Sequence, residues 1–139
     1  MADLAGMLGV SPRRPGSPLH LIRKIEEGLP LSSLDRIATR IAPDDPGFRY
    51  RIVPRSSLAR RRQQHGRLSP DEGARLARIA TLWGFACEVW KDQDKARRFL
   101  FRPHLLLDGQ TPIEVGLASE IGADYVRNIL SGLLYGTAV

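Results

Sequence analysis

Arginine is the residue type with the clearest potential chemistry in this sequence. Seven arginines and no acidic residue lie between Gly47 and Pro70. A guanidinium group attracts phosphate through its charge and can donate two parallel hydrogen bonds to guanine. A dense arginine cluster therefore favours a surface that binds nucleic acid. The alternative is an arginine-rich surface helix whose charges are only solvated.

The net charge of +6 is distributed unevenly along the chain. Residues 1–70 carry 13 Lys and Arg against six Asp and Glu, whereas residues 71–139 carry eight against nine. The whole excess of positive charge therefore belongs to the first half. This asymmetry is expected when one half of a chain meets a polyanion and the other half meets a different partner.

The residue types that usually carry catalysis are scattered. His20, His65 and His104 have no further ligand at the spacing of a metal site. The single cysteine, Cys87, lies in an apolar stretch without a base beside it. The paired aspartates are typical of helix caps, and no glycine-rich phosphate loop follows a strand. We therefore expect no enzymatic activity, no cofactor and no metal site.

The composition indicates a small cytoplasmic protein. With 139 residues, 42% of them hydrophobic, the chain suits one compact domain or two small ones that share a core. No apolar run is long enough to span a bilayer, so we expect no membrane partner. No basic leader with a long apolar segment begins the sequence, and one cysteine cannot form an internal disulfide.

The expected elements are helices. Residues 1–18 are interpreted as a flexible arm, because proline, glycine and arginine cluster there. Two segments, Ser69–Glu72 and Thr111–Glu114, have the sequence of a capping box with proline at the first helical position. Period-2 alternation is almost absent, so the expected fold class is all-α. Besides a short helix after Pro46, helices are predicted over roughly residues 20–27, 32–41, 55–64, 70–90, 93–101 and 123–135.

The basic cluster coincides with the layout of a helix-turn-helix. The short helix after Pro46 leads into a turn at Val53-Pro54, and a second helix begins at Arg55. In such a unit the first residues of the second helix meet base edges in the major groove, and later arginines contact phosphates. The expected DNA-binding residues are Arg49, Arg51, Arg55, Ser56, Ser57, Arg60, Arg61 and Arg62.

The second half of the sequence resembles the toxin-binding domain of the Xre/MbcA/ParS antitoxin family. The resemblance rests on residues 96–100, 102–112 and 120–126, and it continues to Gly136. Residues 57–61 and 66–72 also resemble the Xre-type half of that family, so the similarity covers about residues 28–136. This chain departs from the family at four positions, with Phe99 in place of Trp, His104 in place of Asn, Ser57 in place of Thr and Gly73 in place of Ser.

The resemblance implies an Xre-like helix-turn-helix region over residues 19–68, packed on a toxin-binding domain over residues 69–139. It implies two partners, a RES-domain toxin that degrades NAD⁺ and the double-stranded operator DNA of the operon that the antitoxin represses. We expect a homodimer within a toxin–antitoxin hetero-oligomer, because palindromic sites mirror the symmetry of a dimer. One alternative is a stand-alone repressor whose second half serves dimerisation. Another is a module that binds the toxin but no longer binds DNA.

The expected contacts with the toxin lie in the loop after Arg102 and near the end of the chain. Gly109 and the two prolines of the loop favour a defined backbone that presents leucines, although these leucines could instead fill the core. Tyr135 and the apolar tail are expected to block the NAD⁺ pocket of the toxin; the alternative is a frayed tail. The expected toxin-binding residues are Arg102, His104, Leu105, Leu106, Tyr125, Tyr135, Ala138 and Val139.

Overall fold

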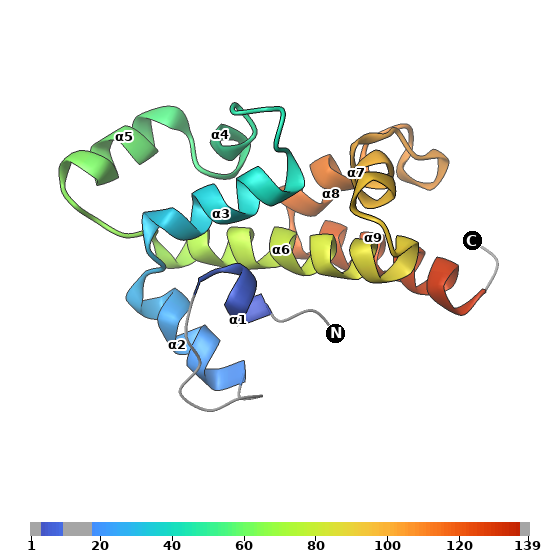
Figure 1. Cartoon of the computed structure of the whole chain (residues 1–139), viewed down its shortest axis with the longest axis horizontal. Coiled ribbons are helices and arrows are strands. Elements are labelled where there is room, and N and C mark those ends of the chain that lie inside the picture. Colours follow the sequence, from blue (N-terminus) through green and yellow to red (C-terminus); the bar gives the residue numbers. More distant parts are fainter. Residues whose placement is uncertain (1–3, 10–17, 137–139) are drawn as a thin grey trace. The chain divides into compact units, whose positions relative to one another are not determined.

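The structure, a computed structural model, describes residues 4–9 and 18–136, and these residues contain helices and no strand (Figure 1). The expected all-α class is confirmed. A short 3₁₀ helix, η1, lies between two of the later α-helices. The elements are α1 (Leu4–Met7), α2 (Pro18–Glu27), α3 (Leu31–Ile41), α4 (Arg49–Ile52), α5 (Arg55–Gln63), α6 (Pro70–Trp90), α7 (Gln93–Phe101), η1 (Leu105–Leu107), α8 (Pro112–Ala118) and α9 (Glu120–Tyr135).

The described residues fall into two compact units, which lie within Asp3–Ala77 and within Arg78–Val139. The division falls inside α6, so this helix contributes residues to each unit. The sequence places its division slightly earlier, between residues 68 and 69, immediately ahead of the same helix.

The core of the first unit is built on one face of α3. Leu34, Ile37 and Ile41 repeat at helical spacing and are fully buried. Each such side chain contributes about 1.5–3 kcal/mol through removal of apolar surface from water. Gly28 ends α2 with a φ of +109°, and a Cβ there would lie 2.9 Å from the Cβ of Arg67. The connection between α2 and α3 therefore requires glycine.

Residues 4–9 differ from the expected flexible arm. They form α1, whose Met7 and the following Leu8 are buried. The hydroxyl of Ser33 on α3 donates a hydrogen bond to the carbonyl oxygen of Leu8. The prediction is therefore wrong for this segment, because tertiary burial stabilises a helix too short to be recognised from its own sequence. Pro18, the last residue of the expected arm, begins α2. The remainder of the arm, residues 1–3 and 10–17, lies outside the described residues.

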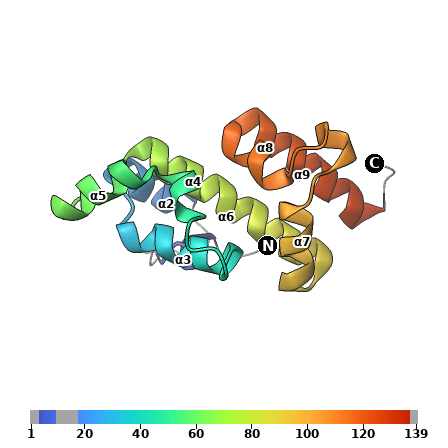
Figure 2. The same ribbon diagram turned by 90° about the horizontal axis from the view of Figure 1, so that it is seen from above.

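The second unit packs α8 against α9 and α7 (Figure 2). Gly116 of α8 lies so close to α6 that a Cβ would come within 2.5 Å of the Leu82 side chain. Arg78 stabilises the end of α8, since its Nε and Nη2 donate to the carbonyl oxygens of Gly116 and Leu117, each at 2.8 Å. Its Nη1 also lies 3.2 Å from a carboxylate oxygen of Glu120. Carbonyl groups at a helix end that lack intrahelical partners are thereby satisfied.

The two expected capping boxes are confirmed. The backbone N–H of Glu72 donates to Ser69 Oγ at 3.1 Å, and the N–H of Ser69 donates to Glu72 Oε1 at 2.7 Å. The pair Thr111 and Glu114 makes the same reciprocal bonds at the start of α8. The last helix begins at Glu120 rather than at residue 123, because Ser119 caps it by accepting from the N–H of Gly122.

Candidate functional site

The basic face of the first unit is carried by α4 and α5, which apolar side chains hold in place. Ile52 and Val53 are fully buried at the turn, and Leu58 is the buried residue of α5. Pro54 has extended backbone and fixes the start of α5. A helix with so little apolar surface depends on its neighbours for stability and leaves most of its surface free for a partner.

The first turn of α5 presents the residues that we expect to meet base edges. Arg55 and Ser56 are exposed, and Ser57 is half-buried. The guanidinium of Arg55 stacks over the ring of Tyr50, with its central carbon 3.9 Å from the ring centroid. Sequence reasoning missed Tyr50, although an aromatic residue among arginines is a signal for such stacking.

Two of the expected DNA-binding arginines form ion pairs with Asp35 of α3. Arg49 pairs with Asp35 through Nη1 and Oδ1. Nη2 of Arg62 lies 3.8 Å from Asp35 Oδ2. Asp35 therefore balances part of the positive charge of this face, and no local pattern in the sequence indicated that it would do so.

Arg61 has a different environment from its neighbours on α5. Its Nε lies 2.8 Å from Oε1 of Glu72, and both side chains are largely buried. Burial by itself would raise the pKa of Glu72, but the hydrogen bonds from Ser69 and the cation of Arg61 outweigh it, so the pKa of Glu72 is lowered. Arg61 thus joins α5 to the first turn of α6 and offers less of its surface to a phosphate than expected.

Two further arginines of the cluster, Arg51 and Arg60, have no acidic partner in the part of the chain that the structure describes. Arg60 and Arg51 are both exposed, and neither forms an ion pair with another of the described residues. The guanidinium of Arg51 lies 5.7 Å from the centroid of the Phe48 ring. Exposed first-turn residues and an unpaired arginine one turn later therefore occur together on α5.

In the second unit, three consecutive leucines in the loop after α7 differ in their exposure to solvent. Leu107 is buried, Leu106 is 39% exposed and Leu105 is 91% exposed. The chain turns through positive φ angles at Asp108 and Gly109, and the N–H of His104 donates to the carbonyl oxygen of Gln110 at 3.0 Å. The loop thus projects one large apolar side chain into solvent from hydrogen-bonded backbone.

His104 begins η1. Its Nδ1 accepts a hydrogen bond from the backbone N–H of Leu106 at 3.1 Å. In the neutral imidazole the proton is therefore on Nε2. The residue fills the role of an N-cap, which explains how histidine is accommodated at a position where the resembled family usually has asparagine.

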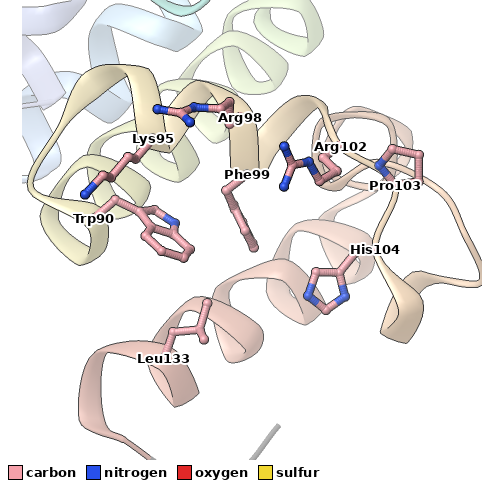
Figure 3. Close-up of a pocket in the computed structure, with 8 residues that line it drawn as sticks. All are labelled: Trp90, Lys95, Arg98, Phe99, Arg102, Pro103, His104 and Leu133. Atoms are coloured by element: carbon pink, nitrogen blue, oxygen red, sulfur yellow. The ribbon is translucent and has the colours of Figure 1, made fainter.

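The other expected toxin contacts lie on α9 and beside a pocket. Tyr125 and Tyr135 of α9 are 50% and 74% exposed. Arg102 lines a pocket together with His104 (Figure 3). Ala138 and Val139 lie outside the described residues.

Three further exposed apolar residues of this unit were not expected from the sequence. Ile121 and Leu133 of α9 are 81% and 42% exposed, and Trp90 at the end of α6 is 37% exposed. Trp90 and Leu133 repeat at core spacing in the sequence, so periodicity alone assigns them to the interior. Exposed apolar side chains on one small unit are typical of a surface that binds a protein.

Within residues 4–9 and 18–136, no group of three or more His, Cys, Asp or Glu side chains is arranged to hold a metal ion. Among the same residues, no helix is both long and apolar enough to cross a bilayer.

Both regions of the chain match known protein families. Residues 20–80 match the antitoxin Xre-like helix-turn-helix domain, and residues 86–136 match the antitoxin Xre/MbcA/ParS C-terminal toxin-binding domain. A protein named Antitoxin Xre from Photorhabdus laumondii is 32% identical over 120 residues, which are 84% of this chain and 80% of that protein.

A second protein named Antitoxin Xre, from Pseudomonas putida, is 31% identical over 91 residues, which are 66% of this chain. The chain spans 57% of the length of that relative. The two family matches occur in this order along the chain, and the relatives are more than 30% identical to it. Together these findings show the family. The chain belongs to the Xre family of type II antitoxins, with a helix-turn-helix domain followed by a toxin-binding domain.

Proposed function

We propose that this antitoxin neutralises a RES-domain toxin, an enzyme that degrades NAD⁺, and that it represses its own operon by binding promoter DNA. The antitoxin has no catalytic role of its own in this proposal. It acts in the cytoplasm, where both NAD⁺ and the operon are found. The RES identity of the toxin rests on the family resemblance of residues 96–136.

The observation that carries the proposal is the exposure of Leu105 on an ordered loop. A leucine that is 91% exposed gains nothing from burial within its own chain. Hydrogen bonds already hold the loop backbone, so a partner that covers Leu105 orders little additional chain on binding. Leu106, Tyr125 and Tyr135 add exposed apolar surface on the same unit, as a toxin contact requires.

The basic face of the first unit supports the second part of the proposal. In this proposal the exposed Arg55 and Ser56 read base edges, and the exposed Arg60 contacts a phosphate. A single short recognition helix gives little affinity, so two copies of the chain would bind the two halves of a palindromic site. We therefore propose a homodimer within the toxin–antitoxin complex.

The test is co-expression of this chain with the reading frame that adjoins its gene. We expect the neighbour alone to stop growth and deplete cellular NAD⁺, and we expect co-expression to restore both and to yield a co-purifying complex. A toxic neighbour that leaves NAD⁺ unchanged would contradict the RES assignment alone. Absence of both rescue and complex would contradict the antitoxin role and leave a stand-alone repressor, for which binding to its own promoter fragment is the decisive measurement.

A further inference from the structure

The second unit contains a pocket of about 340 Å³, a volume in the range of sites that bind small ligands. The end of α6, helix α7, the residues that follow it and α9 form its walls. Figure 3 shows Phe99 pointing from α7 toward α9, between Trp90 and His104. The lining residues are Trp90, Lys95, Arg98, Phe99, Arg102, Pro103, His104 and Leu133.

Part of the pocket lining is apolar and partly exposed to solvent. Trp90 and Leu133 are partly exposed there. The ring of Phe99 lies 6.1 Å from that of Trp90 at an angle of 41°, and 5.9 Å from the ring of His104 at 73°. The rings therefore contact one another as a continuous wall, rather than as two parallel plates between which a planar base would stack.

Another part of the pocket lining is positively charged. Lys95, Arg98 and Arg102 are exposed, and no acidic residue lines the pocket. Within the part of the chain that the structure describes, none of these three cations forms an ion pair, whereas Arg97 of the same helix pairs with Asp94 at 3.0 Å. These unpaired cations give this part of the pocket a positive charge, which favours an anionic partner.

His104 adds a hydrogen-bond donor to the lining of the pocket. Its Nδ1 accepts from the N–H of Leu106, so the neutral ring carries its proton on Nε2. Three cations and one donor beside an apolar wall complement a ligand that combines an apolar group with a carboxylate.

We infer that this pocket receives a segment of the toxin in which an apolar or aromatic side chain is accompanied by one or more carboxylates. The inference rests on the proposed function, because the occupant belongs to the toxin. The apolar side chain packs against Phe99 and Leu133, while its acidic neighbours pair with Arg98 and Arg102. Burial of a side chain in a pocket beside desolvated ion pairs is typical of the residues that dominate binding energy at protein interfaces.

The test measures affinity of the full chain for the toxin encoded beside its gene. Arg98→Glu reverses one charge of the pocket, and Arg23→Glu makes the same change of net charge on α2 of the first unit. Arg23 is exposed, so Arg23→Glu controls for the effect of net charge on long-range attraction between the chain and the toxin. Leu133→Glu places a carboxylate in the pocket by a change at an already exposed position. Thermal melting of each variant shows that it folds.

We expect Arg98→Glu and Leu133→Glu each to weaken toxin binding on the order of tenfold or more, and Arg23→Glu to stay within about twofold of wild type. Equal affinities for wild type and both pocket variants would overturn the inference while leaving the antitoxin role intact. Failure of the wild-type chain to bind the toxin would instead contradict the proposed function, and the inference with it. If the free chain binds AMP and Arg98→Glu abolishes that binding, the occupant of the pocket is a nucleotide and the inference of a toxin segment is overturned.

Discussion

The guanidinium of Arg55 rests on the face of the Tyr50 ring, 3.9 Å from its centroid. Arg55 is the first residue of α5, and Tyr50 belongs to α4, so the contact joins the two helices of the basic face. Stacking leaves the edge of the guanidinium, with its N–H groups, available for hydrogen bonds in the plane of the group. Tyr50 is therefore a positioning residue for the arginine that we expect to read a base.

Replacing Tyr50 by alanine should reduce discrimination between promoter DNA and unrelated DNA. A cation–π contact at an exposed site contributes about 0.5–1 kcal/mol, which corresponds to an affinity loss of roughly two- to fivefold. Tyr50→Phe keeps the ring face and should bind as wild type does. Fluorescence anisotropy with both DNAs measures the effect. An equal loss in Tyr50→Phe would show that the hydroxyl, and not the stacking, matters.

Arg60 and Arg61 should have separable roles despite their adjacency. Arg60→Ala should weaken binding to all DNA sequences alike and reduce the slope of log affinity against log salt by about 1, because it removes one phosphate contact. Arg61→Ala should instead lower the free energy of unfolding by about 1–2 kcal/mol, since Glu72 loses its charged partner. Salt titrations and urea unfolding distinguish the two. A loss of stability in Arg60→Ala, together with a loss of DNA affinity but not of stability in Arg61→Ala, would contradict these roles.

Glu72 should make the stability of the chain dependent on acid pH. Its folded pKa is lowered, so its ionised form stabilises the fold fully at pH values above the unfolded pKa of about 4.3. That contribution is lost as the pH falls through the lowered folded pKa. Glu72→Gln retains a capping-box side chain but has no titration. Its melting temperature should fall less steeply than that of wild type between pH 5 and pH 3, values chosen to bracket an ordinary glutamate at about 4.3.

Leu105 and Leu107 form a matched pair for testing the exposed loop. Leu105→Asp should weaken toxin binding by about tenfold or more without changing the melting temperature, because this side chain is 91% exposed. Leu107→Asp should destabilise the fold, since it places a charge at a position that is only 7% exposed. Pull-down and thermal melting separate the two effects. Full toxin binding by Leu105→Asp would exclude the leucine from the interface.

Gly122 should tolerate no larger residue. An added Cβ would lie 2.2 Å from the carbonyl oxygen of Val115, a backbone atom that cannot rotate away. Gly122→Ala should therefore cost about 1–3 kcal/mol of stability, despite the better helix propensity of alanine. Gly73→Ala is the control, because its Cβ would meet the side chain of Ile25 at 3.4 Å. That variant should be neutral or slightly stabilising in urea unfolding.

Local signals in the sequence predicted the helices well. The capping boxes at Ser69 and Thr111 satisfy their own helix ends, so their residues identify those ends without knowledge of the fold. Helix α1 was missed because Met7 and Leu8 depend on burial against α3. The start of α9 was missed because glycine at position 122 lowers helix propensity, whereas its real role is close approach to Val115.

The candidate sites depended more on tertiary structure. The sequence showed a run of arginines, but it could not show that Asp35 and Glu72 would approach Arg49 and Arg61 from other helices. Three adjacent leucines also look alike in a sequence. Their different environments, with Leu107 buried and Leu105 exposed, follow from the packing of η1 in the folded chain, which the sequence does not show.

The cap formed by His104 changes how relatives of this chain are best searched for. In this loop the N–H of Leu106 donates to an imidazole nitrogen, an acceptor that can stand where a carboxamide oxygen would also accept. A search pattern that demands asparagine at this position would pass over this chain. A pattern that admits any side chain able to accept a hydrogen bond from the nearby backbone, such as Asn, Asp, Ser, Thr or His, would describe the chemistry of the position. Such a pattern would also retrieve divergent members of the family that carry a different residue there.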